Sequence, residues 1–190
     1  MLEELKKIKE LNSIKENKIF YSAFFSKDDL VKLFKKLKDN EYLGYNQLID
    51  ITAIDYPSKE KRFELVYILL SMKQNKRIVL KTLLDENDSI DSLNEVFIAS
   101  DWYERECYDL FGINFNNHPD LRRIMTDYNF EGFPLRKDFP LTGHNEVRYD
   151  DVEKKVVYEP VKLTQEYRDF DYTSPWEGMT NGIDDHSEQE

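Results

Sequence analysis

The chain has 190 residues, of which 40% are hydrophobic and 14% aromatic, so it can bury a core and does not resemble a disordered chain. Its net charge of −11 offers nothing to the phosphates of nucleic acid, which excludes nucleic acid as an expected partner. The single cysteine, Cys107, excludes an internal disulfide and also an iron–sulfur cluster held by this chain alone, because such a cluster needs about four ligands.

The two ends of the chain differ in charge. Residues 1–39 hold ten lysines against seven acidic residues, whereas residues 150–190 hold four basic against twelve acidic residues. The longest apolar run, Leu65–Leu70, is far shorter than the ~18–20 residues of a membrane helix. The Lys/Glu-rich start lacks the apolar stretch of a signal peptide, and its acidic residues do not suit a transit peptide. We therefore expect no membrane span in this chain.

The first third of the chain predicts a helix, a strand and a second helix. Residues 2–16 carry leucine and isoleucine three apart, which indicates a short charged helix. The aromatic-rich stretch 19–25 predicts a strand. Ser26 resembles a helix N-cap, and the helix after it has one apolar face. That face consists of Leu30, Leu33, Phe34 and Leu37.

The middle of the chain predicts three strands and a third helix. Residues 47–55, 62–72 and 77–84 are rich in strand-forming side chains, and a short polar connection makes the last two a hairpin. Ser92 with Glu95 three residues later forms a capping-box pattern, so the helix should start there and run to Phe111. Gly112 then suits a left-handed C-cap.

Beyond Gly112 the periodicity fades although large side chains persist. Five of the six prolines lie between positions 119 and 175, together with many phenylalanines, tyrosines and a tryptophan. A flexible linker would be rich in glycine and serine instead. We expect an irregular segment bound to a partner surface, the alternative being that it folds back on its own domain. Residues 180–190 are expected to be a loose end.

The densest group of charged residues lies between positions 101 and 109. Residues four apart on a helix are neighbours, so Arg105 is predicted to pair with both Asp101 and Asp109 in an ion-pair ladder. Five of the eight arginines lie between 101 and 150, where lysine is nearly absent, and the rigid guanidinium fork suits fixed polar contacts.

A catalytic interpretation of this group is the rival. It would make the chain a stand-alone hydrolase that uses the carboxylates of Glu104 and Glu106 with His118 as proton carrier. The structural interpretation is favoured because no nucleophile lies beside a recognisable base, and Cys107 has no cationic activator in its helical turn. Cofactor motifs such as CxxC, a glycine-rich phosphate loop and HExxH do not occur, and the three histidines lie far apart.

A longer pattern identifies a family. Glu104-Arg-Glu-x-x-Asp109-Leu-Phe is followed after six residues by His118, and after three more by Arg122-x-Ile-Met125. Together with FGI, HPDLRRIMTDY, FEGFPLRKDFPLTG and SPWEG, it resembles the C (30-kilodalton) subunit of respiratory complex I, the proton-pumping NADH:quinone oxidoreductase, over roughly residues 18–178. The pattern residues are Glu104, Arg105, Glu106, Asp109, Leu110, Phe111, His118, Arg122, Ile124 and Met125.

The resemblance implies an α+β fold, a two-layer domain with a mixed β-sheet and helices followed by a long irregular C-terminal arm. Residues 1–17 would be an N-terminal extension, 18–131 the core domain and 132–190 an arm wrapped on the D (49-kilodalton) subunit. The expected partner-binding residues are Arg136, Tyr158, Phe170, Tyr172 and Trp176.

The resemblance also implies a function. Family members are cofactor-free core subunits of the peripheral arm, without catalytic residues of their own, that support electron transfer from NADH to quinone. NADH, FMN, iron–sulfur clusters and ubiquinone would be bound by other subunits. The tail resembles the mitochondrial and alphaproteobacterial branch, so we expect the matrix side of the mitochondrial inner membrane, or alternatively the cytoplasmic face of a bacterial inner membrane. The equivalent subunit of a membrane-bound hydrogenase, F420H2 dehydrogenase or photosynthetic complex is the alternative, against which SPWEG argues.

Overall fold

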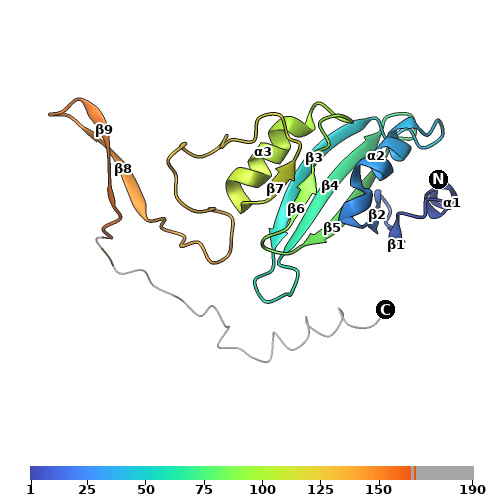
Figure 1. Cartoon of the computed structure of the whole chain (residues 1–190), viewed down its shortest axis with the longest axis horizontal. Helices are drawn as coiled ribbons and strands as arrows, with labels where there is room; N and C mark the ends of the chain where they lie inside the picture. The colour runs from blue at the N-terminus through green and yellow to red at the C-terminus, as the bar shows by residue number, and fades with distance from the viewer. Residues whose placement is uncertain (164, 166–190) are drawn as a thin grey trace. The chain divides into compact units, whose positions relative to one another are not determined.

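The computed structural model describes residues 1–163 and 165 (Figure 1). These residues fall into two units, a compact one from Met1 to Gly143 and a second that starts at His144. The sequence had suggested that the arm begins at 132, but residues 132–143 belong to the first unit. Each unit is described by itself below.

A five-stranded sheet forms the centre of the first unit. Its strands lie in the order β1-β2-β5-β4-β3, and neighbours are antiparallel except for the parallel pair β2 and β5. The expected mixed sheet is thus confirmed, as are three long strands in the middle of the chain. The strands are β1 Asn12–Glu16, β2 Phe20–Phe24, β3 Gln47–Asp55, β4 Phe63–Ser71 and β5 Lys76–Leu84.

Helices α2 (Leu30–Asp39) and α3 (Ser100–Phe111) cover one face of this sheet (Figure 1). The ring of Phe34 in α2 packs edge-on against that of Tyr67 in β4, with 5.0 Å between centroids. From α3, the thiol of Cys107 donates a hydrogen bond to the carbonyl of Ile51 in β3. The core therefore lies between the two helices and this face, and all four predicted apolar positions of α2 are buried.

The predicted N-terminal helix is wrong in extent. Helix α1 covers only Leu2–Lys6, and residues 12–16 instead form β1, which pairs with β2. Leucine spacing continued to position 11 because Leu5 and Leu11 both reach the core, one from the helix and one from the chain after it. The next helix begins with a 3-10 turn, η1 (Lys27–Asp29), and the side chain of Ser26 makes no cap.

The predicted start of α3 is also wrong, whereas its end is confirmed. The helix begins at Ser100, and the hydroxyl of Ser92 instead donates to the Glu104 carboxylate at 2.6 Å. Two short strands flank α3 in the sequence and pair with each other in parallel. They are β6 (Ser89–Asp91), which precedes the helix, and β7 (Asn114–Asn116), which follows it. Gly112 ends α3 in the left-handed conformation with φ of 77°.

The second unit contains a regular hairpin where the sequence had suggested an irregular arm. Strands β8 (Asn145–Asp150) and β9 (Lys155–Pro160) pair antiparallel with Val147 opposite Tyr158. No helix within the described part of the chain is long and apolar enough to span a bilayer.

Candidate functional site

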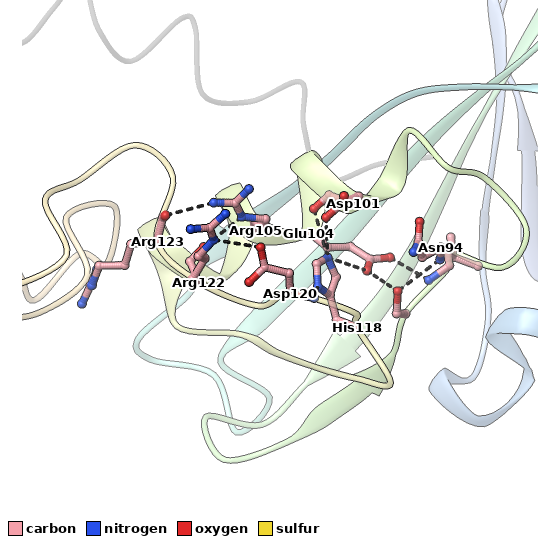
Figure 2. A network of polar contacts seen from close by, with 10 residues as sticks. Asn94, Asp101, Glu104, Arg105, His118, Asp120, Arg122 and Arg123 are labelled. Atoms are coloured by element: carbon pink, nitrogen blue, oxygen red, sulfur yellow. Dashed lines mark hydrogen bonds and ion pairs between the residues drawn. The ribbon is translucent and has the colours of Figure 1, made fainter.

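Several of the family-pattern residues, among them Glu104, Arg105 and His118, meet where helix α3 packs against the loop 117–126 that follows β7 (Figure 2). We call this region the α3 clasp, defined as Asp101, Glu104, Arg105 and Asp109 on the helix together with Ser92, Leu93, His118, Asp120 and Arg122–Thr126. Glu104 and Asp109 are both fully buried, although a charged side chain is costly to bury unless it is bonded. Their partners therefore explain the local structure.

Asp109 fixes the far end of the loop. Its Oδ2 accepts three consecutive backbone N–H groups, from Ile124 at 3.0 Å, Met125 at 2.6 Å and Thr126 at 2.8 Å. Its Oδ1 accepts from the hydroxyl of Thr126 and from Nη1 of Arg123, the latter at 2.7 Å. Because the Asp109 carboxylate accepts five hydrogen bonds, it holds the loop in a concave turn around its two oxygens.

The ionised form of Asp109 is strongly favoured. Burial by itself would raise the pKa of this carboxyl, but the hydroxyl and N–H of Thr126, the guanidinium of Arg123 and the N–H of Met125 together lower the pKa to about 2. Arg123 also donates to the carbonyl of Gly132 at 3.0 Å, so the same guanidinium ties the loop to the following segment.

Glu104 fixes the segment before α3. Its two oxygens accept from the hydroxyl of Ser92 at 2.6 Å and from the backbone N–H of Leu93 at 2.7 Å. Burial raises the pKa of Glu104, and these two hydrogen bonds only partly offset it. A protonated Glu104 would lose one acceptor but could keep its contacts with Ser92 and Leu93. A protonated Asp109 could not keep all five of its hydrogen bonds.

His118 is a fully buried side chain with a defined tautomer. Its Nδ1 accepts the backbone N–H of Asp120 at 3.1 Å, so in the neutral ring the hydrogen is assigned to Nε2. That nitrogen lies 3.1 Å from the carbonyl and 3.2 Å from Oδ1 of Asp101, and 3.9 Å from Glu104. The imidazole therefore joins the start of the loop to the first turn of α3 (Figure 2).

The predicted Asp101–Arg105–Asp109 ladder is wrong. Arg105 donates instead to two loop carbonyls, that of Arg122 at 3.1 Å and that of Arg123 at 3.2 Å. Asp109 is already saturated by the loop and Asp101 faces the histidine, so neither carboxylate is available to the guanidinium. The clasp is thus held by contacts between α3 and the loop 117–126, and not by pairs of residues along the helix.

The remaining pattern side chains lie in the core, on the surface or between the two. Phe111 is buried in the core and Leu110 packs against it, whereas Glu106 is only half-buried. Arg122 is exposed and pairs with Asp120 at 2.8 Å, and the side chain of Met125 is 65% exposed. Sequence reasoning missed four contributors whose roles depend on contacts made by the folded chain. These are Ser92, Asp120, Arg123 and Thr126.

A second polar network holds residues 136–138 against the end of the sheet. Asp55 and Arg62 form a bidentate pair at 2.8 and 3.0 Å, and the pKa of Asp55 is lowered by that guanidinium. The same carboxylate accepts the N–H of Lys137 at 2.7 Å, and Arg62 also pairs with Asp138 at 2.9 Å.

Arg136, which the sequence had suggested as a partner-binding residue, is committed to contacts within the chain. Its Nε donates to the carbonyl of Phe111 at 2.6 Å, its Nη1 pairs with Glu86 at 2.7 Å, and it lies over the ring of Phe133. Of the other suggested partner-binding residues, Tyr158 is 61% exposed in β9. Phe170, Tyr172 and Trp176 lie outside the described residues.

Burial limits the reactivity and the accessibility of the titratable groups in this region. Cys107 is buried and its burial raises the pKa of the thiol, which disfavours the reactive thiolate. Glu104 and His118 are buried and occupied by neighbours, so neither is presented to a substrate. What the clasp does is fix two stretches of chain against α3.

Comparison with known proteins places this geometry in a family. A family model described as the 30-kilodalton subunit of respiratory-chain NADH dehydrogenase matches residues 24–145. The C subunit of the NADH-quinone oxidoreductase of Hyphomonas neptunium is 55% identical over 157 residues, which cover 83% of this chain and 78% of that protein. Its counterpart from Methylobacterium sp. is 57% identical over 150 residues, covering 79% and 70%.

Two solved structures share the fold. A trypsin-resistant fragment of Nqo5 superposes with a TM-score of 0.54 at 27% identity and covers 63% of this chain and 96% of the fragment. A chain of an archaeal membrane-bound sulfane sulfur reductase superposes with a TM-score of 0.64 at 24% identity over 74% and 83%, which shows the fold alone. On the family match and the identity of these relatives, the chain belongs to the family of 30-kilodalton (C) subunits of respiratory-chain NADH dehydrogenase.

Proposed function

We propose that this chain is the C subunit of a proton-pumping NADH:quinone oxidoreductase and acts there as a structural subunit of the peripheral arm. The relatives carry the name of that subunit and match most of the chain. One structural observation carries the structural role. Two of the three acidic residues of the family pattern, Glu104 and Asp109, are buried and bonded to the chain's own groups, so these two stabilise the fold rather than face a substrate.

The proposal assigns the redox chemistry to other subunits. NADH, FMN and ubiquinone would be bound elsewhere in the complex, and so would the iron–sulfur clusters, which need about four ligands where this chain has one, buried cysteine. The rival hydrolase would need Glu104 and His118 to reach a substrate, and both are buried. The sulfane sulfur reductase resemblance concerns the fold and gives the hydrogenase-type alternative no further support.

The D (49-kilodalton) subunit is the proposed partner of the second unit. In the β8–β9 hairpin, Val147 lies opposite Tyr158 and Tyr149 opposite Val156, so all four side chains share one face. Each is between 53% and 61% exposed, and a two-stranded hairpin is marginally stable alone. Burial of this face against the 49-kilodalton protein would supply the missing stabilisation.

The location follows from the proposed complex. The relatives are bacterial proteins, and a subunit without a membrane helix in its described part would sit on the peripheral side of a membrane complex. We place it on the matrix side of the mitochondrial inner membrane, or on the cytoplasmic face of the inner membrane if the source is a bacterium. Cell fractionation of the source organism decides between these places.

Affinity purification tests the function. A tag on this chain should recover from detergent-solubilised membranes an assembly that oxidises NADH and reduces quinone, with stoichiometric D subunit. The isolated chain should show neither activity. Recovery of a hydrogenase or a coenzyme F420 dehydrogenase would establish the alternative, and turnover of an ester or amide by the isolated chain would establish the hydrolase.

A further inference from the structure

The β8–β9 hairpin has an edge on either side. In the described part of the chain, these two strands pair only with each other and form a two-stranded sheet (Figure 1). The edge of a sheet presents backbone N–H and carbonyl groups that have no partner within the sheet, and another strand can pair with them.

The register identifies the backbone groups at the edge of β8. Val161 donates its N–H to the carbonyl of His144 at 3.1 Å, so these two residues form a hydrogen-bonded pair. Opposed residues of antiparallel strands alternate between hydrogen-bonded and non-hydrogen-bonded pairs. Along the unbroken register from this pair, Asn145, Val147 and Tyr149 fall in non-hydrogen-bonded pairs. Their three N–H groups and three carbonyls therefore point away from β9.

Pro160 agrees with this assignment and makes the two edges of the hairpin unequal. Proline has no N–H, and Pro160 lies opposite Asn145 in a pair that needs no hydrogen bond. The edge of β9 therefore lacks one donor, and β9 begins with Lys155, a residue type that discourages strand addition. Strand β8 contains no proline, no lysine and no bulge. Its edge is the one to which a further strand can be added.

The edge strands of the five-stranded sheet are less suitable for strand addition. The register of β1 is irregular between Asn12 and Lys15, and Ser13 has a φ of 50°, so the edge of β1 is not a straight ladder. Strand β3 is contacted by α3, whose Cys107 thiol donates to the carbonyl of Ile51. Proteins blunt or cover sheet edges in such ways, which makes the regular edge of β8 a candidate for binding.

The side chains of the hairpin indicate the chemistry of the added strand. The four half-exposed valine and tyrosine side chains form an apolar face. The opposite face is charged, and Arg148 pairs there with Glu159 at 3.0 Å and with Asp150 at 3.5 Å. Because successive side chains of a strand point to opposite faces, a strand that alternates apolar and polar residues would extend both faces.

We propose that β8 accepts an extended strand of the D (49-kilodalton) subunit, which pairs with its outer edge as the third strand of the sheet and alternates apolar and polar side chains. This inference rests on the proposed function and deepens it, because it specifies how the hairpin holds that partner. Three strands with an apolar face are about the smallest sheet that is stable, so the added strand also orders the hairpin.

A second copy of this chain fits the edge less well than the D subunit. Two hairpins joined at β8 would leave the apolar face of each exposed to water, because pairing between edges covers no face. Strand β8 has six residues and is about 20 Å long, so the pairing alone covers far less than the ~800 Å² per partner of a stable interface. The D subunit is proposed to cover the apolar face as well.

Amide hydrogen exchange at single-residue resolution tests the proposal on the unaltered protein. The isolated full chain is compared with the purified NADH dehydrogenase. By the same alternation, Glu146, Arg148 and Asp150 donate within the hairpin, so their amides report whether the hairpin itself is formed. The amides of Val147 and Tyr149 should exchange at least tenfold more slowly in the complex, because the added strand accepts their N–H groups. Equal exchange of these two amides in both samples refutes strand addition, and the proposed function stands if the D subunit is present.

Two substitutions at Val147 separate the edge from the apolar face. Val147→Pro removes the outward N–H but keeps an apolar side chain, and proline is tolerated at strand edges where the N–H faces outward. Val147→Ala keeps the N–H but removes part of the apolar surface. Strand addition predicts that the proline variant retains about tenfold less D subunit than the alanine variant. Docking by the apolar face alone predicts the reverse order, and that result overturns the inference, as does equal retention.

The remaining outcomes also decide the matter. If Val147→Pro disrupts the hairpin, so that the amides of Glu146 and Arg148 lose protection in the complex, the exchange of the unaltered protein gives the answer. If sedimentation equilibrium shows that the isolated chain dimerises and that Val147→Pro does not, the added strand comes from a second copy and the assignment to the D subunit is wrong. If the tagged chain recovers no D subunit and no NADH dehydrogenase, the proposed function and this inference fail together.

Discussion

At the scale of single residues, two buried carboxyls on one helix behave oppositely. Asp109→Asn should lower the free energy of unfolding by ~3–5 kcal/mol, since an amide cannot accept all five donors and leaves Arg123 without its charge partner. Glu104→Gln keeps an oxygen for Ser92 or Leu93 and resembles the protonated acid that burial already favours, so its cost should be about 1 kcal/mol. Urea unfolding of both variants measures the difference, and equal costs would contradict this account.

Part of the stability that the chain loses in acid should come from protonation of Asp109. Its pKa is about 2 in the folded chain against 3.8 as an unperturbed carboxyl, so the folded state holds the ionised form more tightly. The resulting stability, on the order of 2 kcal/mol, is present above about pH 4 and disappears as the pH falls towards 2. Comparing urea midpoints of the parent and Asp109→Asn across this range should show a flatter profile for the variant.

Gly112 is a position where only glycine fits. Its φ of 77° is strained for other residues, and an added Cβ would lie 2.7 Å from the Phe133 ring and 2.6 Å from Nη2 of Arg136. Gly112→Ala should therefore cost ~2–4 kcal/mol through strain and displaced neighbours. Gly44→Ala is the matched control, because φ there is also positive but the nearest atom is 3.8 Å away, and it should cost about 1 kcal/mol. Thermal unfolding compares the two.

At the scale of elements, the β8–β9 hairpin should bind without contributing to the stability of the isolated chain. Val147→Ser with Val156→Ser removes two exposed apolar side chains from one face of the hairpin. Retention of the D subunit should fall about tenfold or more, since the exposed half of each valine would be buried only in the complex. The control Val152→Ser lies in the hairpin turn, and loss of the D subunit in that variant as well would remove the assignment to this face.

Elements fixed by local periodicity were predictable, and those fixed by distant partners were not. Helix α2 and strands β3–β5 follow directly from their apolar patterns. The start of α3 was misplaced because Ser92, a good N-cap by sequence, donates to Glu104 twelve positions later. The short strand β1 needed β2 as a template, and its charged sequence carries no alternation.

The same division applies to the clasp. The pattern of Glu104, Asp109 and His118 identified the region and its structural character. The local rule of pairing residues four apart nevertheless assigned the wrong partners to Arg105, because contacts from loop 117–126 occupy both carboxylates first. Only the fold shows that Arg123 rather than Arg122 pairs with Asp109.

At the scale of the whole molecule, the described carboxyls with lowered pKa outnumber those with a raised one. The pKa of Glu10 falls to about 2 through its hydrogen bonds to Lys36 and Lys32, and the pKa values of Asp55, Asp88 and Asp109 are also lowered. Glu104 alone opposes them. The isolated chain should lose stability steadily from about pH 5 to pH 2. Circular dichroism during acid titration measures this loss, and stability that stays constant between about pH 5 and pH 2 would contradict the account.

The parallel pairing of β2 with β5 has a consequence for synthesis. Residues Phe20–Phe24 find their partner in Arg77–Lys81, and the antiparallel strands β3 and β4 are translated in between. On the ribosome β2 is therefore synthesised well before β5. It cannot form this pairing until β5 has also emerged from the exit tunnel. Nascent chains stalled before β5 has left the exit tunnel should be open to proteases around residues 12–24, and longer ones should be protected there.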